Sequence, residues 1–243
     1  MRHVLLVGRS GIGKTTLLKR LAGSARRCAI DGFLTEECLE HDARMGFWLS
    51  PLDGRQILLA HRHLERGARL GPYRVNVSVL TDVAIPVIRR GMQRACVLLL
   101  DELGKMERCS KLFEEAVQDA FDRGPSIVAT AGLPLAPFIS RLKQRRDVEL
   151  IPLSSANYAI VEEELVARLN ALCAEDDAVQ ALQRQADDIC QMIVSGEAPQ
   201  IDIEIQQTRL RHAVSQLFPD QHTLYQLIYE TRFRRLWQQF RHH

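Results

Sequence analysis

The amino-acid sequence predicts an α/β fold, a three-layer sandwich in which helices cover both faces of a mostly parallel sheet, followed by an all-helical C-terminal extension. Two observations lead to this prediction. Short apolar runs alternate with segments of helical periodicity up to about residue 172, and such alternation produces parallel strands joined by crossover helices. Beyond that point only helical periodicity remains. We therefore expect two domains, residues 1–173 and residues 174–243.

The expected elements of residues 1–173 follow from local patterns. Strands are expected where β-branched or apolar residues run together, at 3–7, 28–35, 44–50, 56–61, 95–100, 126–130 and 148–151. Helices are expected where apolar residues recur at helical spacing, from about 14 to 23 and at 79–90, 111–123, 134–146 and 154–172. Pro51-Leu52-Asp53-Gly54 is a turn sequence that predicts a hairpin between its flanking runs, and Pro86 is a local flaw in its helix.

Three helices are expected in the extension. The first carries an apolar stripe and ends at Ser195-Gly196, the second covers about 203–217, and the third begins near Asp220. The stripe of the first helix consists of Val179, Leu182, Ala186, Ile189 and Ile193. The last helix has an aromatic stripe of its own, formed by Tyr225, Tyr229, Phe233, Leu236 and Phe240, with Trp237 beside it.

The charges of the extension leave its role open. Residues 174–204 carry eight carboxylates against one arginine, whereas residues 205–243 carry six arginines against two carboxylates. We favour packing of the aromatic stripe on the preceding helices or on a second subunit, with pairing between the acidic and basic helices. A protein partner bound by these helices is a second interpretation. A basic aromatic helix for nucleic acid or an anionic membrane is the weakest, because the formal net charge of the chain is only +2.

Composition and cysteine spacing favour an ordinary cytoplasmic protein. The six cysteines are scattered, with no C-x-x-C pair and no histidine at zinc spacing, so we expect reduced thiols. The N-terminal apolar run is too short for a signal peptide, and no apolar stretch approaches the roughly 20 residues of a membrane helix. We expect a cytoplasmic location without membrane association.

The segment Gly8-Arg9-Ser10-Gly11-Ile12-Gly13-Lys14-Thr15 matches the phosphate-binding pattern G-x-x-x-x-G-K-[ST], and it lies between an expected strand and an expected helix. The glycines allow the backbone to turn its N–H groups toward phosphate oxygens, and the start of the helix adds its positive dipole end. Lys14 should reach the β- and γ-phosphates, Thr15 should ligate Mg²⁺, and Thr16 should contact the α-phosphate. The alternative, a glycine-rich turn with a chance lysine, does not explain the context.

A second acidic motif ends the buried run 96–100. Asp101 is expected to hold Mg²⁺, and Glu102, which should point to the opposite side of the strand, is expected to act on the water that attacks the γ-phosphate. The alternative is that both acids simply end a strand in solvent. The chain lacks the N-K-x-D motif of guanine-specific switches and the L-S-G-G-Q signature of transporter ATPases. An acid beside the metal ligand suits hydrolysis better than transfer to an acceptor.

Further motifs resemble a known family, the cancer-related nucleoside-triphosphatase family of archaea, some bacteria and animals. The motifs are Asp31-Gly32-Phe33-Leu34-Thr35-Glu36-Glu37, Arg44-Met45-Gly46-Phe47, Leu70-Gly71-Pro72-Tyr73-Arg74-Val75 and Leu100-Asp101-Glu102-Leu103-Gly104-Lys105-Met106-Glu107, followed by Ser110, Phe113, Arg146-Asp147-Val148 and Asn157. The resemblance covers about residues 1–172. It implies a P-loop fold with an added catalytic glutamate and slow, Mg²⁺-dependent γ-phosphate hydrolysis of several nucleotides.

The resemblance also implies site candidates. It supports Lys14, Thr15, Asp101 and Glu102 in the roles above, and it adds Glu36, Arg44, Lys105 and Glu107 without firm roles. Arg44 and the cluster Arg141, Lys143, Arg145 and Arg146 are candidates for the cation that stabilises the transition state, although the cluster is better interpreted as a solvated helix end. The family has Asn-Arg where this chain has Asn157-Tyr158, so its nucleotide preference can differ.

The sequence leaves three functions to compare. The first is a nucleoside-triphosphatase that acts on ATP, GTP and other nucleoside triphosphates. The second is a nucleotide or nucleoside kinase on the same scaffold, for which residues 31–75 would supply an acceptor pocket. The third is a nucleotide-gated adaptor that acts through residues 174–243.

Overall fold

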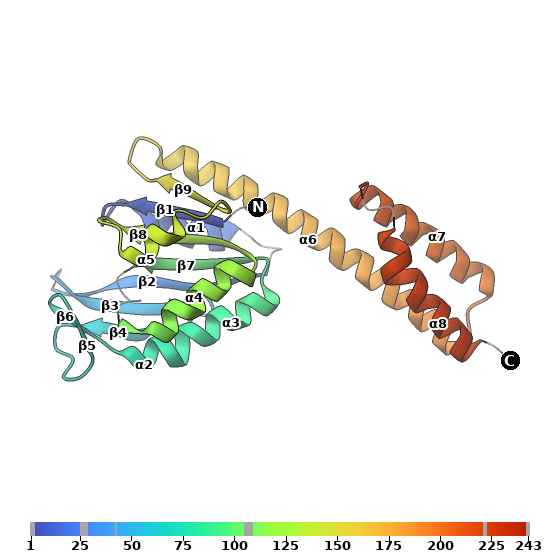
Figure 1. The fold of residues 1–243 in the computed structure, drawn as a ribbon, viewed down its shortest axis with the longest axis horizontal. Helices are drawn as coiled ribbons and strands as arrows, with labels where there is room; N and C mark the ends of the chain where they lie inside the picture. Colours follow the sequence, from blue (N-terminus) through green and yellow to red (C-terminus); the bar gives the residue numbers. More distant parts are fainter. Residues whose placement is uncertain (1–2, 25–28, 42, 105–108, 221–222, 242–243) are drawn as a thin grey trace. The chain divides into compact units, whose positions relative to one another are not determined.

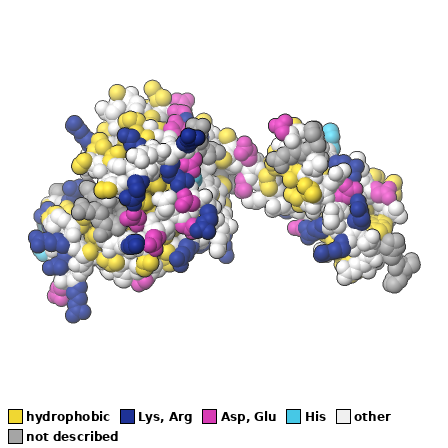
Figure 2. Space-filling view, in the orientation of Figure 1, with side chains coloured by type: hydrophobic (Ala, Val, Ile, Leu, Met, Phe, Trp, Pro, Cys, Tyr) yellow, Lys and Arg dark blue, Asp and Glu magenta, His cyan; other side chains and the backbone are white. Residues whose placement is uncertain are grey.

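The computed structural model describes residues 3–24, 29–41, 43–104, 109–220 and 223–241. The chain divides into two compact units, Met1–Cys173 and Ala174–His243. Among the described residues, no helix has the length and apolar character that crossing a bilayer requires. Figure 2 shows Lys and Arg side chains interspersed with Asp and Glu on the visible face of the molecule.

The first unit is built on a mixed sheet of nine strands in its described part, in the order β5-β6-β4-β3-β2-β7-β8-β1-β9 (Figure 1). The parallel half contains β1 (His3–Gly8), β2 (Ile30–Glu40), β7 (Val97–Leu103), β8 (Ser126–Gly132) and β9 (Val148–Pro152). The other half is antiparallel and contains β3 (Ala43–Pro51), β4 (Ile57–His61), β5 (Ala68–Leu70) and β6 (Tyr73–Val75). The predicted hairpin around Pro51-Leu52-Asp53-Gly54 is confirmed as β3–β4, whereas β5 and β6 were not predicted from the sequence.

Helices cover both faces of this sheet, as the predicted three-layer sandwich requires. The helices of the first unit are α1 (Lys14–Ser24), α2 (Val77–Val79), α3 (Ile85–Arg94), α4 (Lys111–Arg123), α5 (Pro137–Leu142) and the first part of α6 (Tyr158–Ser195). Successive residues of β1 enter different cores. Leu5 lies in the core that holds residues of α3, α4 and α5, whereas Val4 and Leu6 lie in the core that holds residues of α1 and α6. The strand is therefore buried on both faces.

Several predicted boundaries are wrong, for local reasons. Pro86 has no backbone N–H for the preceding helical turn, and a π-helical turn, η1 (Leu80–Ala84), stands directly before α3. The helix expected at 134–146 is only six residues long. Residues 143–147 form a turn, in which Arg145 donates a hydrogen bond to the carbonyl of Phe121. The break expected near Cys173 is absent, since α6 continues to Ser195. The expectation of reduced thiols is wrong for Cys96, which is disulfide-bonded, and confirmed for Cys38 and Cys190, which are free.

The second unit has a core of its own. It contains the second part of α6, then α7 (Gln200–Leu217), a π-helical turn η3 (Gln226–Glu230) and α8 (Thr231–Phe240). All residues of the α6 stripe except Val179 pack with Ile203, Tyr225 and Phe233 in one hydrophobic cluster. Arg232 pairs with Asp187 at 3.0 Å, which joins the basic and acidic helices as expected. The aromatic stripe is thus largely internal to this unit.

Gly32 sits where β2 lies against β7. Its φ is +135°, and a Cβ there would lie 2.0 Å from the carbonyl oxygen of Leu99, its neighbour in the parallel register. Only glycine satisfies both the backbone conformation and the close approach. The conformation belongs to the Asp31-Gly32-Phe33 motif, in which Asp31 accepts two hydrogen bonds from Arg90 at 2.6 and 2.7 Å and Phe33 enters the core. The first three residues of this motif therefore have structural roles.

Gly32→Ala should lower the free energy of unfolding by about 2–5 kcal/mol, because the new methyl group collides with backbone that cannot move away. Gly23→Ala in α1 is the matched control, since nothing lies within 4 Å of a Cβ at that position. The control should stabilise the protein by roughly 0.5–1 kcal/mol. Urea titrations of both variants measure the two changes. Equal behaviour of the two variants would contradict this account.

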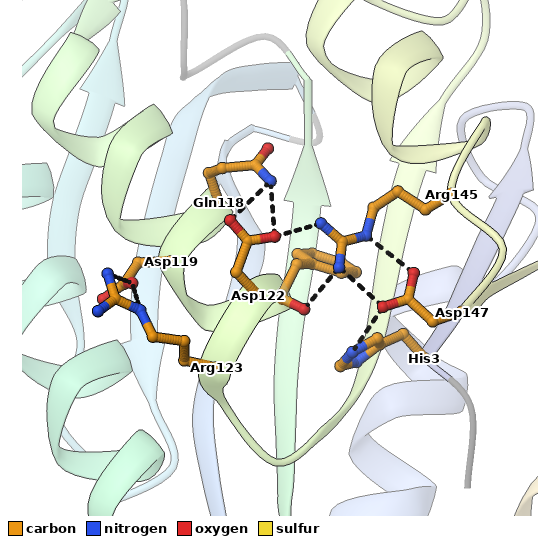
Figure 3. A network of polar contacts seen from close by, with 8 residues as sticks. His3, Gln118, Asp119, Asp122, Arg123, Arg145 and Asp147 are labelled. Atoms are coloured by element: carbon orange, nitrogen blue, oxygen red, sulfur yellow. Dashed lines mark hydrogen bonds and ion pairs between the residues drawn. The ribbon is translucent and has the colours of Figure 1, made fainter.

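A polar network joins the amino-terminal ends of β1 and β9 to α4, at the opposite end of the strands from Gly8 (Figure 3). Arg145 is its centre. It donates to both carboxylate oxygens of Asp147 at 2.9 and 2.7 Å and to the carbonyl of Phe121 at 2.9 Å, and it pairs with Asp122. His3 lies 3.9 Å from Asp147 and packs on the ring of Phe121, and its buried Nδ1 has no hydrogen-bond partner in the described part of the chain. Burial lowers the pKa of His3, despite the attraction of Asp147.

The lowered pKa of His3 predicts a pH dependence of stability. The unfolded chain takes up the His3 proton near pH 6.5 whereas the folded chain resists it, so the contribution to stability is complete above about pH 6.5 and is lost as the pH falls through the folded pKa. His3→Phe keeps a ring against Phe121 and cannot titrate. Free energies of unfolding at pH 7.5 and 5.5 should therefore fall more for wild type than for the variant. Equal losses would refute the prediction. Asp147 does not interfere, because the Arg145 hydrogen bonds hold its pKa below the usual value of 3.8.

Candidate active site

The loop between β1 and α1 has the shape of a phosphate cradle. β1 ends at Gly8 and α1 begins at Lys14, with Gly11 at φ +80° and Gly13 at φ +97° between them. These left-handed conformations let successive N–H groups face one side of the loop. Tyr158 of α6 closes the loop from outside, because its hydroxyl donates to the Gly13 carbonyl at 3.3 Å and its ring would collide with any Cβ at Gly13. This tyrosine supports the loop at the position where the family resemblance implies an arginine.

Lys14 folds back over the loop. Its side chain is 6% exposed, and Nζ donates to the carbonyl oxygens of Gly8 and Arg9, each at 3.1 Å. The same ammonium lies 3.9 Å from Oε2 of Glu102. Lys14 therefore links the loop to the acidic end of β7.

Asp101 is the most buried charged group of the site. It is fully buried and accepts three hydrogen bonds, from Thr15 Oγ1 at 2.6 Å, the Thr35 backbone N–H at 3.0 Å and Thr130 Oγ1 at 2.5 Å. Burial raises the pKa of the Asp101 carboxyl, while these hydrogen bonds and the charge of Lys14 act in the opposite direction. The donors come from α1, β2 and β8, so three neighbouring elements converge on this one carboxylate.

Glu102 departs from regular strand geometry. Its φ is +55°, and the register between β7 and β8 shifts between Leu100 and Leu103. A regular strand would send Asp101 and Glu102 to opposite faces, as the sequence analysis expected. The structure instead brings both carboxylates to the P-loop, Asp101 to Thr15 and Glu102 to Lys14. Such a backbone conformation costs free energy in a non-glycine residue and clusters at functional sites.

Thr35 and Thr130 belong to the site but were not singled out in these roles from the sequence. Thr130 Oγ1 donates to Asp101 Oδ1 and accepts the backbone N–H of Glu102 at 2.8 Å, so one hydroxyl holds both acids. The available signal was the strand pattern itself. Thr130 lies near the carboxyl end of β8, and Thr35 lies just beyond the part of β2 that pairs with β7. This is the edge at which the parallel strands of an α/β sheet place their ligands.

A cavity of about 780 Å³ opens beside these groups. Of the predicted phosphate-binding residues, Ser10, Gly11, Gly13, Lys14, Thr15 and Thr16 line it, together with Glu102. Gly8 and Arg9 contribute the carbonyl groups that hold Lys14, and Ile12 packs with the core on the α1 side. The cavity continues over β2, β3 and the β5–β6 turn.

The candidates Glu36 and Arg44 also line this cavity. Glu36 pairs with Lys19 at 2.5 Å and accepts a hydrogen bond from Ser50, and these contacts lower its pKa. Arg44 pairs with Glu37 at 2.7 Å and donates to the Tyr73 hydroxyl at 3.3 Å. Lys105 and Glu107 lie outside the described residues.

Other sequence candidates have structural partners elsewhere. Arg141 pairs with Glu114, and Arg145 belongs to the network of Figure 3. Asn157 holds the loop before α6, because its side chain accepts the Ser154 N–H at 2.8 Å and donates to the Pro152 carbonyl at 2.7 Å.

The donor set at Thr15 and Asp101 fits Mg²⁺. This ion is usually bound through one or two carboxylates, with substrate phosphates and water filling its other positions. One hydroxyl and one buried carboxylate, 2.6 Å apart, match that pattern. The described residues contain no group of three or more His, Cys, Asp or Glu side chains arranged to hold a metal ion.

Comparisons with known proteins identify the family of the chain. The profile of a family described as NTPase matches residues 3–166. The chain belongs to this NTPase family. The nucleoside-triphosphatase THEP1 of Thermotoga sp. (strain RQ2) is 36% identical over 166 residues, which cover 68% of this chain and 94% of the relative. The human cancer-related nucleoside-triphosphatase is 33% identical over 174 residues, which cover 64% of this chain and 90% of the relative.

Solved structures of the family share the fold. The solution structure of the human cancer-related nucleoside triphosphatase superposes with a TM-score of 0.60 at 30% identity, and covers 70% of this chain and 98% of its own. The crystal structure of THEP1 from Aquifex aeolicus gives 0.61 at 29% identity, with 69% and 98% coverage. These relatives are covered almost completely by about two thirds of this chain. The fold expected from the sequence is confirmed, as is the expected family.

Thr130→Val should weaken the site while keeping its shape. Asp101 loses a donor and the Glu102 N–H loses an acceptor, so the free energy of unfolding should fall by about 1–3 kcal/mol. Release of phosphate from nucleoside triphosphates should fall as well, because both acids lose their common anchor. Thr130→Ser, which retains the hydroxyl, is the control and should keep most of both properties. Urea titration and a phosphate-release assay measure the two effects, and a fully active, fully stable valine variant would contradict this role.

Proposed function

We propose that the protein hydrolyses nucleoside triphosphates to nucleoside diphosphates and phosphate, with Mg²⁺, at the site formed by the P-loop and the end of β7. One observation carries the proposal. The αL conformation of Glu102 places its carboxylate 3.9 Å from the P-loop lysine while Asp101 holds Thr15, so an acid for water and an acid for metal stand at the same phosphate site.

The phosphate tail is proposed to bind along residues 8–16. The N–H groups of Gly8, Arg9, Ser10, Gly11, Ile12, Gly13, Lys14, Thr15 and Thr16 form the cradle, and Lys14 exchanges its carbonyl contacts for the β- and γ-phosphates. The Thr16 hydroxyl adds a contact to the α-phosphate. Because these groups contact the phosphates and not the base, we expect the protein to hydrolyse several nucleotides, including ATP and GTP.

Thr15 and Asp101 are the proposed Mg²⁺ ligands. When bound there, the ion would neutralise charge on the β- and γ-phosphates. Asp101 is suited to the task because its three donors fix its orientation before any nucleotide binds. A fixed carboxylate needs little reorganisation at the moment of reaction.

Glu102 is the proposed general base. Its side chain is 30% exposed, so water can reach it, and its backbone is held by Thr130. The carboxylate accepts a proton from the attacking water as the new oxygen–phosphorus bond forms, and the bond to the β-phosphate oxygen breaks. Lys14 is proposed to stabilise the charge that develops on the transferred group.

Arg44 is the proposed additional cation of the transition state. The guanidinium stands at the rim of the cavity, where Glu37 and the Tyr73 hydroxyl hold it. Its pKa is raised by these contacts, so it remains a cation at any physiological pH. An arginine in this role must give up part of its contact with Glu37 to reach the phosphates.

The domain division and the location are part of the proposal. The cradle, the metal ligands and the base all belong to residues 1–173, and the NTPase relatives align with this part. We assign hydrolysis to this domain and treat residues 174–243 as an appended helical domain, whose outer surface would serve a protein partner or self-association. A cytoplasmic location fits the reaction, because nucleoside triphosphates and magnesium are abundant there.

Glu102→Gln should abolish hydrolysis and spare binding. The amide cannot accept the proton of the attacking water, so turnover of ATP, GTP, CTP and UTP should fall at least about 10²-fold. Affinity for a fluorescent nucleotide analogue should change little, since the cradle and Thr15–Asp101 are intact. Phosphate release without any added acceptor distinguishes hydrolysis from the kinase alternative.

Glu36→Gln is the matched control, because Glu36 is another carboxylate of the same cavity. It should retain most of the turnover. If Glu36→Gln lost turnover while Glu102→Gln kept it, the base would have to be reassigned to Glu36. Phosphate release only in the presence of a particular acceptor would instead favour a kinase.

A further inference from the structure

The cavity extends well beyond the groups that handle phosphate. Its far part, the aromatic compartment, is lined by Arg44, Phe47, Leu59, Ala60, Leu70, Pro72, Tyr73 and Val75. These residues come from β3, β4, β5, β6 and the turn between β5 and β6, which form the antiparallel half of the sheet. The cradle does not use this compartment, and of its residues the proposed hydrolysis uses only Arg44.

The position of the compartment excludes it as the place for the base of the hydrolysed nucleotide. In a P-loop the lysine and the metal mark the β- and γ-phosphates, and the base is attached at the opposite, α-phosphate end. Lys14, Glu102 and the Thr15–Asp101 pair mark that γ-phosphate end here. From there the cavity continues past Thr35 and Glu36 of β2 into the compartment. A molecule in the compartment would therefore face the γ-phosphate and not the base.

Two aromatic rings give the compartment its character. Phe47 and Tyr73 meet edge to face, with ring centroids 5.3 Å apart, above the apolar side chains of Leu59 and Val75. Cations hold the rings in place, since Arg44 lies 5.6 Å from the Phe47 centroid and Arg62 lies 5.7 Å from that of Tyr73. Preformed apolar cavities with a few polar groups are typical binding sites for small planar molecules.

The polar groups at the rim define the ligand further. Arg44 and the Tyr73 hydroxyl supply donors, and Glu37 supplies an acceptor. The charge of Arg44 is already matched by Glu37 at 2.7 Å, as that of Lys19 is by Glu36 at 2.5 Å. The compartment thus suits a neutral ring that both donates and accepts hydrogen bonds, because Arg44, the cation that lines it in the described part of the chain, is already paired with a carboxylate.

We propose that the aromatic compartment binds a nucleoside, as a second ligand next to the γ-phosphate of the nucleotide in the P-loop. This inference rests on the proposed function, because it takes the P-loop as the triphosphate site. The base of the nucleoside lies against Tyr73 and Phe47, and its edge bonds to the rim. Bound there, the nucleoside borders the position of the attacking water and changes the turnover rate without competing for the P-loop.

The test is a calorimetric titration of the full chain saturated with Mg²⁺ and a non-hydrolysable triphosphate analogue. Adenosine, guanosine, cytidine and uridine are titrated in turn. At least one should bind one to one while the analogue stays bound, and its 5′-monophosphate should bind no more tightly. Tyr73→Ala should weaken this binding roughly tenfold, because base–aromatic stacking is lost. Tyr73→Phe keeps the ring and should stay within about threefold of wild type.

Three results would overturn the inference. They are no binding of any nucleoside, displacement of the analogue by the nucleoside, and equal nucleoside affinity in wild type and Tyr73→Ala. Analogue affinity, measured for every variant, shows that the fold and the P-loop are intact. Failure of the analogue itself to bind would count against the proposed function, whereas tight analogue binding without a nucleoside would remove only the present inference.

Discussion

The site depends on a carboxylate buried without any exposed surface. Asp101 can remain in the interior only if its oxygens are satisfied, because an unpaired buried charge is among the most costly features a fold can contain. Its donors are Thr15 at the start of α1, the Thr35 backbone of β2 and Thr130 of β8. The order β2-β7-β8-β1 places these three elements around the end of β7. The same contacts that satisfy the charge therefore fix the geometry of the phosphate site.

The second acid is brought in by backbone strain. Glu102 adopts φ +55° at the register shift of β7, and Thr130 accepts its N–H while donating to Asp101. A strand that alternated regularly would turn one acid away from the P-loop, whereas this one presents both. The packing of the surrounding sheet offsets the free-energy cost of this conformation, since Leu100 and Leu103, which flank the two acids, are buried. Strain of this kind is compatible with a role in catalysis, because the surrounding structure determines it.

The sequence predicted those parts of the molecule in which local pattern and structure coincide. The P-loop, the buried run before Asp101 and the β3–β4 hairpin each carry their own signal within a few residues. The strands β5 and β6 were missed because three-residue strands show no measurable alternation. The apparent break at Cys173 was wrong because α6 changes its packing partners there without ending. The roles of Thr35 and Thr130 depend on strand order, which no single segment encodes.

The two halves of the sheet contribute different parts of the site in the first domain. The parallel half supplies every group that holds Asp101, at the carboxyl ends where helices and strands meet. The antiparallel half supplies the cavity wall. Arg44 and Phe47 of β3 contact Tyr73 of β6 across β4, which pairs with both of these strands. β2 is the shared strand, parallel to β7 and antiparallel to β3, and its Thr35 and Glu36 face one half each. Under the two proposals above, the phosphates of the nucleotide would lie on one side of β2 and the ring of the nucleoside on the other.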